Sequence, residues 1–275
     1  MEPTDSSTDY VLGRDPNASI RLDAQHLLWR MHRGHILDPM IQVREDMAIA
    51  ELGCGTGCWL FDLAQQLPIS VQLHGYDISD EQFPAADLWP HNVELGVLDS
   101  LADPPAFLKA KYDVIHLRMW ASNVGTSDSR DLIRHASKLL KPGGYIQWEE
   151  ADLIHQVVSP GIAKEIEHGL TNFFKLVGLD YSWAHKLPAT LESEGLAVLH
   201  YGKDAFQGYS TYLCTTTYLA ALLEIITGIV RSGRTSRTVA DPHMTAVEEL
   251  LKRRTGAIVY NWGPLSILAK KPASE

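Results

Sequence analysis

Cysteine is scarce in this chain. Its 275 residues include only three, Cys54, Cys58 and Cys214. An odd number of cysteines without paired spacing provides neither a disulfide framework nor the ligand pairs of a zinc motif. We therefore expect no disulfide and no bound metal, and we interpret Cys54 and Cys58 as small side chains buried at a turn and in the first turn of a helix.

Basic residues and long apolar runs are scarce as well. Lysine and arginine number 24 against 34 aspartate and glutamate residues, so the formal net charge is −10. Broad nucleic-acid binding needs a basic surface that neutralises phosphates, which argues against such a partner. No apolar stretch approaches the about 20 residues that cross a bilayer, and the start of the chain lacks the basic and apolar parts of a signal peptide. We expect a cytoplasmic protein with no membrane partner.

One segment carries most of the functional information. The run Glu51-Leu52-Gly53-Cys54-Gly55-Thr56-Gly57 follows the apolar residues 47–50, which indicates a strand that ends in a glycine-rich turn before a helix. Glycines there permit positive φ angles and let the backbone approach a ligand closely. The spacing is Gly-x-Gly-x-Gly rather than the Gly-x-Gly-x-x-Gly of dinucleotide sites. The acidic Glu51 suits an ammonium or sulfonium group rather than phosphates.

A second acidic position follows the glycines at a set distance. Residues 70–79 read as a strand that ends at Asp77 and Ile78. This is about 20 residues past the turn, where a carboxylate meets a ribose diol. The two features together indicate a site for an adenosine ligand.

At this point the sequence resembles the class I S-adenosylmethionine-dependent methyltransferases, whose first motif reads like Glu51 to Gly57. Val97-Leu98-Asp99, residues 112–118 and residues 139–148 match later parts of the family in order. The resemblance implies an α/β fold with a Rossmann-like, seven-stranded, mostly parallel sheet and helices on both faces. It also implies S-adenosylmethionine as cofactor and S-adenosylhomocysteine as product. The implied cofactor contacts are Glu51, Gly53, Cys54, Gly55, Asp77, Ile78, Leu98 and Asp99, the last beside the adenine amine.

A finer resemblance concerns a fungal branch of that superfamily, which works mostly in secondary metabolism and includes relatives of a global regulator. It rests on Tyr10, residues 21–26, His-Leu-Arg at 116–118 and Trp-Glu-Glu at 148–150. In that branch the N-terminal segment covers the cofactor. Tyr10 and Gln25 are therefore candidate contacts with its carboxylate or adenosine part, and helix packing and surface charge are the alternative.

The hydrophobic pattern alternates between strands and helices, as a parallel sheet with covering helices requires. It predicts an amphipathic helix over 20–38 capped by Ser19, a helix over 129–140 and a fifth strand over 145–150. Beyond residue 152 it predicts helices over 161–177 and 212–231 and antiparallel strands over 195–203 and 257–270.

These elements suggest three parts. Residues 1–40 form an N-terminal helical extension that covers the cofactor site. Residues 41–204 and 236–275 form the methyltransferase core. Residues 205–235 form a helical cap, inserted over the acceptor pocket.

Several side chains compete for roles at the acceptor. Arg118 ends the fourth strand, where open α/β sheets place ligand contacts, and we weigh cofactor or substrate contact equally against a structural role. Alternation sends Glu149 and Glu150 to opposite faces; we favour Glu149 as the catalytic, site-facing residue and Glu150 as the partner of a helix or of solvent. His155, in the loop that follows, is the candidate general base. His116 is interpreted as a core histidine.

Aromatic side chains favour a bulky, apolar or aromatic acceptor, although each of them alone is more typical of a core. The candidates are Trp120, Trp148, Phe173, Phe174, Trp183, Tyr209, Tyr212 and Trp262.

The leading hypothesis is transfer of a methyl group to a small molecule, a secondary metabolite, by in-line displacement, with oxygen as the favoured acceptor atom and nitrogen or sulfur as the alternatives. Two alternatives stay open. One is a regulatory protein that binds the cofactor and acts through protein partners, and the other is an enzyme that promotes a rearrangement without methyl transfer. The protein is expected to be a monomer or a homodimer.

Overall fold

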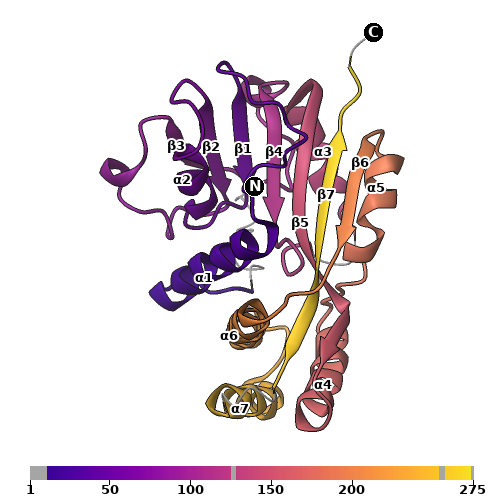
Figure 1. Ribbon diagram of the computed structural model, residues 1–275. Helices are drawn as coiled ribbons and strands as arrows, with labels where there is room; N and C mark the ends of the chain where they lie inside the picture. Colours follow the sequence, from indigo (N-terminus) through magenta and orange to yellow (C-terminus); the bar gives the residue numbers. More distant parts are fainter. Residues whose placement is uncertain (1–10, 125–127, 254–257, 274–275) are drawn as a thin grey trace, which may run out of the picture.

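A seven-stranded sheet forms the centre of the molecule (Figure 1). The computed structural model describes residues 11–124, 128–253 and 258–273. The strands lie in the order β3-β2-β1-β4-β5-β7-β6; β1 to β5 are parallel, and β7 runs antiparallel to both of its neighbours. This confirms the predicted fold class. The strands are β1 (Ala48–Leu52), β2 (Gln72–Asp77), β3 (Val93–Val97), β4 (Tyr112–Arg118), β5 (Leu140–Val158), β6 (Ala197–Lys203) and β7 (Tyr260–Lys270).

Helices cover both faces of the sheet and its lower edge (Figure 1). The helices α3 (Arg130–Leu139) and α5 (Leu187–Ser193) pack on one face, and α2 (Cys58–Ala64) packs on the other. The helices α1 (Pro16–Arg33), α6 (Tyr209–Arg231), α7 (Arg237–Lys252) and α4 (Ile162–Leu176) lie beyond the carboxyl ends of the parallel strands. Single 3-10 turns lie at Ala86–Leu88, Ala106–Leu108 and Ala184–Lys186.

The first helix begins earlier than the sequence pattern predicts. Asp15 is its N-cap, because its carboxylate accepts hydrogen bonds from the backbone N–H groups of Asn17 (2.8 Å) and Ala18 (3.1 Å). Proline at the first helical position favours that start. The prediction of Ser19 as the cap is therefore wrong. The helix ends at Arg33, five residues before the predicted end, and Gly34, whose φ of 71° is left-handed, is its C-cap.

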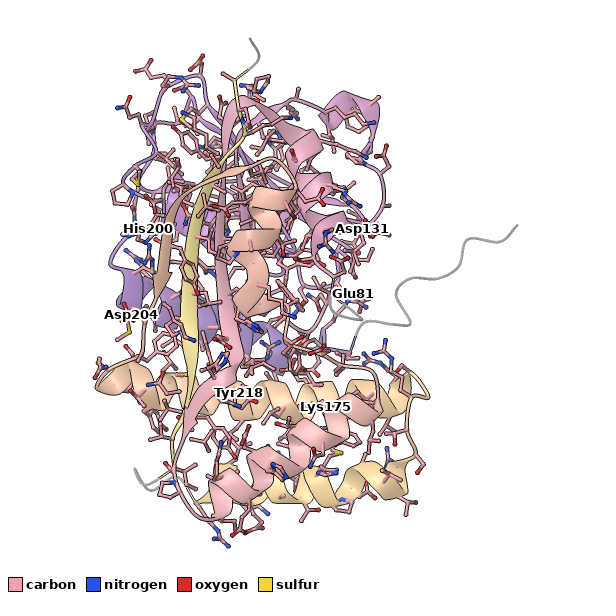
Figure 2. All side chains as sticks on the ribbon, turned by 90° about the vertical axis from the view of Figure 1, so that its right-hand side faces the viewer. Glu81, Asp131, Lys175, His200, Asp204 and Tyr218 are labelled. Carbon is pink, nitrogen blue, oxygen red and sulfur yellow. The ribbon has the colours of Figure 1, made fainter. Side chains whose placement is uncertain are left out.

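Strand β5 runs to Val158 instead of ending at residue 150. It continues because β7 pairs with it along most of its length, as far as Val158 opposite Tyr260. The two long strands extend past the sheet into the helical layer, which Figure 2 shows beneath the sheet from the side.

The helical layer has its own hydrophobic cluster. Buried residues of α4, α6 and α7 pack there together with Val11 and Leu12 of the N-terminal segment. The predicted cap over 205–235 corresponds to α6, and the structure adds α4 and α7 to the same layer. The helix α7 is not evident from the sequence because Pro242 lies inside it, at a position where proline normally interrupts a helix.

One helix in the described part of the chain is long and apolar enough to cross a membrane by composition. This is α6, with 23 residues and a mean hydropathy of 1.7 in its most apolar window. Half of that window is buried inside the protein, and α6 packs on α1 and α7. Helices buried in a protein core also reach this length and hydropathy, so α6 alone is weak evidence of a membrane span.

Candidate functional site

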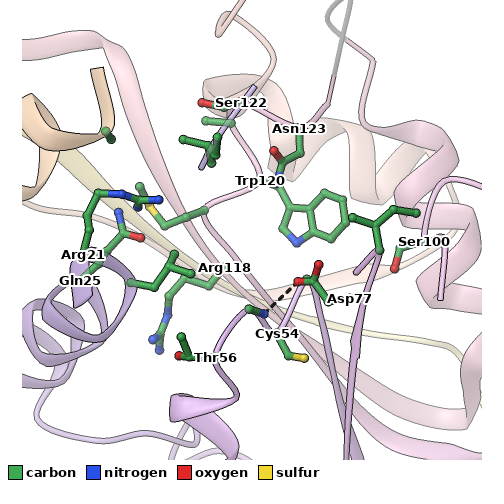
Figure 3. Close-up of a pocket in the computed structure, with 18 of the residues that line it drawn as sticks. Arg21, Gln25, Cys54, Thr56, Asp77, Ser100, Arg118, Trp120, Ser122 and Asn123 are labelled. Carbon is green, nitrogen blue, oxygen red and sulfur yellow. Dashed lines mark hydrogen bonds between the residues drawn. The ribbon is translucent and has the colours of Figure 1, made fainter. Parts of the chain in front are cut away.

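A cavity of about 470 Å³ opens where the parallel strands end, between the sheet, α1 and α6. The turns after β1, β2, β3 and β4 all contribute to its wall. Figure 3 shows Arg21, Gln25 and Arg118 on one side of it and Asp77, Ser100 and Trp120 on the other. This is the edge at which open α/β sheets bind ligands, because the strand order reverses between β1 and β4.

The glycine turn after β1 forms a close-fitting part of this wall. Gly53, Gly55 and Gly57 have φ angles of 67°, 53° and 74°, which side-chain-bearing residues rarely adopt. A Cβ at Gly53 would come within 2.9 Å of the Trp120 ring, and one at Gly55 within 2.9 Å of Leu22. The turn is therefore shaped to leave the backbone bare toward the cavity.

Asp77 joins the end of β2 to this turn. Its carboxylate accepts a hydrogen bond of 2.8 Å from the Gly55 N–H (dashed in Figure 3). Burial raises the pKa of the Asp77 carboxyl, and the backbone N–H groups of Gly55 and Ser79 partly oppose that rise. The carboxylate also lines the cavity, where it is available to a hydroxyl donor.

Glu51 places a buried carboxylate in the cavity wall. The residue is 4 % exposed and lines the wall. Its Oε1 lies 3.0 Å from Nδ1 of His116, while its Oε2 is buried without a hydrogen-bond partner in the described part of the chain. An unsatisfied buried carboxylate oxygen is costly unless a ligand meets it. The site therefore fits a cationic group, as the sequence predicts.

Arg118 is held from two sides. Its Nε and Nη2 each lie 2.6 Å from Oε2 of Glu149, and its Nη1 lies 3.0 Å from Nδ1 of His26. Burial raises the pKa of Glu149, but Arg118 and His116 outweigh burial and lower it to about 2. Since Nδ1 of His26 accepts from Arg118, its Nε2 carries the proton that bonds to Asp62 at 2.9 Å. Burial and Arg118 lower the pKa of His26, which keeps this ring neutral.

The other half of the cavity is mainly apolar. Leu153 and Trp262 of the long strands, Leu179, and Ala221 and Ile225 of α6 form its walls. Tyr218 also lines it and lies between the sheet and the helical layer in Figure 2. Burial raises the pKa of the Tyr218 phenol, so this group is neutral. The chamber suits an apolar molecule larger than a few atoms.

The loop after β4 contributes Trp120, one of the aromatic candidates, and also Ser122 and Asn123, which the sequence analysis did not predict. Met119 has a φ of 56°, a left-handed value that is unusual for a side-chain-bearing residue, and it turns the chain so that Trp120, Ser122 and Asn123 line the cavity. The Trp120 N–H donates to Oε2 of Glu150 (2.9 Å), and its indole N–H donates to the Leu52 carbonyl (3.1 Å). The place of this loop directly after β4 could have identified it, because ligands bind at the carboxyl ends of the strands in open α/β sheets.

The structure gathers most of the predicted site residues. Ten of them line the cavity: Gln25, Glu51, Gly53, Cys54, Gly55, Asp77, Ile78, Leu98, Asp99 and Arg118. Tyr10 lies outside the described residues. Glu149 does not line the cavity but lies behind Arg118.

The predicted positions of His155 and Glu150 need correction. His155 lies within β5 rather than in a loop, because the strand continues past it. Its side chain is 53 % exposed, contacts Asp152 at 2.8 Å and does not line the cavity. Glu150 does point to the face opposite Glu149, but it is fully buried against the Trp120 loop rather than facing solvent.

Of the eight aromatic candidates, Trp120 and Trp262 line the cavity. Trp148 and Trp183 pack edge to face in the core, with ring centroids 5.9 Å apart. Phe173 and Phe174 lie in the helical-layer cluster, and Tyr209 and Tyr212 are exposed.

Comparison with known proteins supports this picture. Residues 50–146 match the family model described as a methyltransferase domain. The chain is 34 % identical over 151 residues to the methyltransferase grgD of Penicillium sp, covering 52 % of each protein. It is 29 % identical over 142 residues to the N-methyltransferase verN of Clonostachys rogersoniana, covering 51 % of this chain and 50 % of the relative. The chain thus spans about half the length of the curated relatives it matches.

Among solved structures, the [4+2]-cyclase SpnF aligns with a TM-score of 0.55 at 19 % identity, over 90 % of this chain and 81 % of SpnF. At that identity the similarity shows the fold alone.

Proposed function

Since this chain belongs to the class I S-adenosylmethionine-dependent methyltransferases, in the fungal secondary-metabolism branch, we propose that it transfers a methyl group from S-adenosylmethionine to a small-molecule acceptor. The observation that carries the proposal is one continuous cavity. Its polar half holds the bare glycine turn, Glu51 and Asp77, and its other half is an apolar chamber.

The polar half has the donor set that S-adenosylmethionine needs. In this proposal Asp77 accepts from the ribose hydroxyls, Asp99 from the adenine amine, and the unpartnered Oε2 of Glu51 from the ammonium. The bare backbone of Gly53 and Gly55 admits the ligand at close range. When bound, S-adenosylmethionine supplies a methyl group already activated by its sulfonium.

The protein's own contribution is position and exclusion of water. The helices α1 and α6 close the cavity on the side away from the sheet, and the bidentate pair of Arg21 and Glu224 links them at 2.6 and 2.8 Å. Holding an acceptor in line with the methyl group in a closed site supplies much of the rate of such a reaction.

The proposal also covers the kind of acceptor molecule and the atom that is methylated. The apolar walls favour a bulky, apolar or aromatic molecule, and we propose oxygen as the acceptor atom, as the sequence analysis favours. The similarity to verN, which is named an N-methyltransferase, makes nitrogen the alternative. An oxygen acceptor benefits from a base; His155, the predicted base, lies outside the cavity wall, and both ring nitrogens of His26 are occupied.

Mass spectrometry of reaction mixtures tests this proposal. The protein is incubated with S-adenosylmethionine and fungal metabolite fractions, and products are compared with a sample containing heat-inactivated protein. A product heavier by one methylene, with equimolar S-adenosylhomocysteine, supports methyl transfer. An isomer of equal mass supports rearrangement instead, and cofactor binding without any turnover supports a regulatory role.

A further inference from the structure

Four charged or titratable side chains lie in register below the polar half of the cavity. Glu51 of β1 is the strand partner of His116 in β4, and Arg118 of β4 is the strand partner of Glu149 in β5. Residues two apart on a strand point to the same face. All four side chains therefore gather on the face that α1 and α2 cover, where His26 and Trp59 contact them.

Glu149 contacts two of the other three side chains in this group, Arg118 and His116. It is 2 % exposed and does not line the cavity. Its Oε2 contacts Nε and Nη2 of Arg118, each at 2.6 Å. It also lies 3.5 Å from Nε2 of His116, an ion-pair distance without a hydrogen bond between the two described residues. A charge this deeply buried is tolerated because its partner fixes and neutralises it. Glu149 can therefore affect a bound ligand only through Arg118 and His116.

His116 lies between Glu149 and Glu51 and contacts both. Its ring is fully buried and stacks on the Trp59 ring, with centroids 3.8 Å apart and planes 4° apart. Because a carboxylate only accepts hydrogen bonds, Nδ1 of His116 is the donor to Oε1 of Glu51. This contact occupies one oxygen of Glu51, a residue of the cavity wall, and leaves its buried Oε2 without a partner in the described part of the chain.

These contacts leave one acidic and one basic side chain with hydrogen-bonding capacity that no described residue uses. Oε2 of Glu51 is a negative acceptor. Arg118 has five N–H groups: Nε donates to Oε2 of Glu149, Nη2 lies 2.6 Å from the same oxygen, and Nη1 donates to His26. In the described part of the chain, at least two of the five N–H groups therefore have no hydrogen-bond partner. Both residues line the same cavity. One negative and one positive group on one wall are complementary to a zwitterion that carries an ammonium and a carboxylate.

We propose that Glu149 is a positioning residue. It holds Arg118 directly, and Glu51 through His116, as the paired contacts for the carboxylate and ammonium of the amino-acid part of the methyl donor. The inference rests on the proposed function, since the amino-acid part belongs to S-adenosylmethionine. A buried arginine that loses its fixed carboxylate reorients toward other acceptors, and its contact with the ligand is lost.

Calorimetry with two ligands tests the proposal. S-adenosylhomocysteine carries the amino-acid part, whereas 5′-methylthioadenosine lacks it. Glu149→Gln is expected to weaken binding of S-adenosylhomocysteine about tenfold and to change binding of 5′-methylthioadenosine less than twofold. Arg118→Gln is expected to do the same, and the double variant is expected to add nothing further, because both residues act through one contact.

Glu150→Gln is the matched control. It makes the same chemical change at the adjacent, equally buried position on the opposite face of β5. Because the amide oxygen of glutamine still accepts from the Trp120 N–H and keeps that part of the cavity wall in place, the ratio of the two affinities is expected to stay unchanged. If Glu149→Gln fails to fold, the double variant replaces it, because removing both charges leaves no unpaired ion; its affinity ratio must then equal that of Arg118→Gln.

Three results separate the possible failures. If Glu149→Gln weakens both ligands equally, or weakens neither, the positioning role is refuted while donor binding stands. A double variant with a lower affinity ratio than Arg118→Gln refutes it as well. If the unaltered protein binds neither ligand, the proposed function itself fails.

Discussion

The Asp77 carboxylate accepts a hydrogen bond from the backbone N–H of Gly55 over 2.8 Å, which ties the end of β2 to the glycine turn after β1. The same residue lines the cavity, so one side chain both fixes the turn and faces the cavity. Substitutions at these two residues separate the two roles.

Asp77→Asn is expected to weaken S-adenosylhomocysteine binding about tenfold with little effect on the melting temperature. The amide keeps an oxygen for the Gly55 N–H but replaces a charged acceptor of the ribose hydroxyls by a neutral one, which weakens those bonds. Titration calorimetry measures the affinity. Asp80→Asn, at an exposed position three residues further on, is the control and is expected to bind normally. Equal affinity in both variants would exclude Asp77 from the ribose site.

Gly55→Ala is expected to abolish measurable donor binding and to lower the free energy of unfolding by about 1 kcal/mol or more. A Cβ there meets Leu22 at 2.9 Å and requires a left-handed backbone at a φ of 53°. Gly178→Ala imposes similar backbone strain, with a φ of 78°, where no atom lies within 4 Å of the new Cβ. Chemical denaturation of both variants isolates the backbone cost. Loss of donor binding in Gly178→Ala as well would show that strain alone explains the effect.

Glu150 gives the stability a specific pH dependence. Burial raises its pKa from 4.5 to about 7, although hydrogen bonds from Ala151, Trp148 and Trp120 oppose that rise. The folded state therefore binds the proton more tightly than the unfolded state. The resulting stabilisation is complete below pH 4.5 and is lost as the pH rises through 7.

The free energy of unfolding of the unaltered protein, relative to Glu150→Gln, is expected to fall by about 3 kcal/mol between pH 4.5 and pH 8. Urea denaturation at several pH values measures both curves. Parallel curves for the two proteins would mean that Glu150 titrates alike in the folded and unfolded states.

His155→Ala is expected to leave turnover within about twofold of the unaltered protein, because the side chain lies outside the cavity wall. Its carboxylate partner Asp152 keeps the contact with Lys203 at 2.7 Å, so the fold is maintained. The assay follows formation of S-adenosylhomocysteine with an acceptor found by mass spectrometry. A loss of a hundredfold or more, restored by raising the pH, would instead establish His155 as the general base.

The polar half of the cavity could be predicted from the sequence because its signals are local. Gly53, Gly55 and Asp77 each owe their position to a strand end and a turn that short stretches of sequence define. The strand order then brings these turns together without further information.

The rest of the cavity and its surroundings depend on long-range strand pairing, which composition does not reveal. The position of His155 follows from the pairing of β5 with β7, more than 100 residues away in sequence. The Trp120 loop is fixed by Glu150 through a contact that no motif predicts. Because Pro242 lies inside α7, the sequence pattern does not indicate a helix there, and the full helical layer is evident only from the structure.

Titration of the protein with S-adenosylmethionine in a calorimeter is the decisive test of the cavity as a donor site. We expect saturable binding of one equivalent with a dissociation constant in the micromolar range or below, and competition by S-adenosylhomocysteine. Absence of binding by the folded protein at these concentrations would contradict the assignment of the cavity, and with it the proposed methyl transfer.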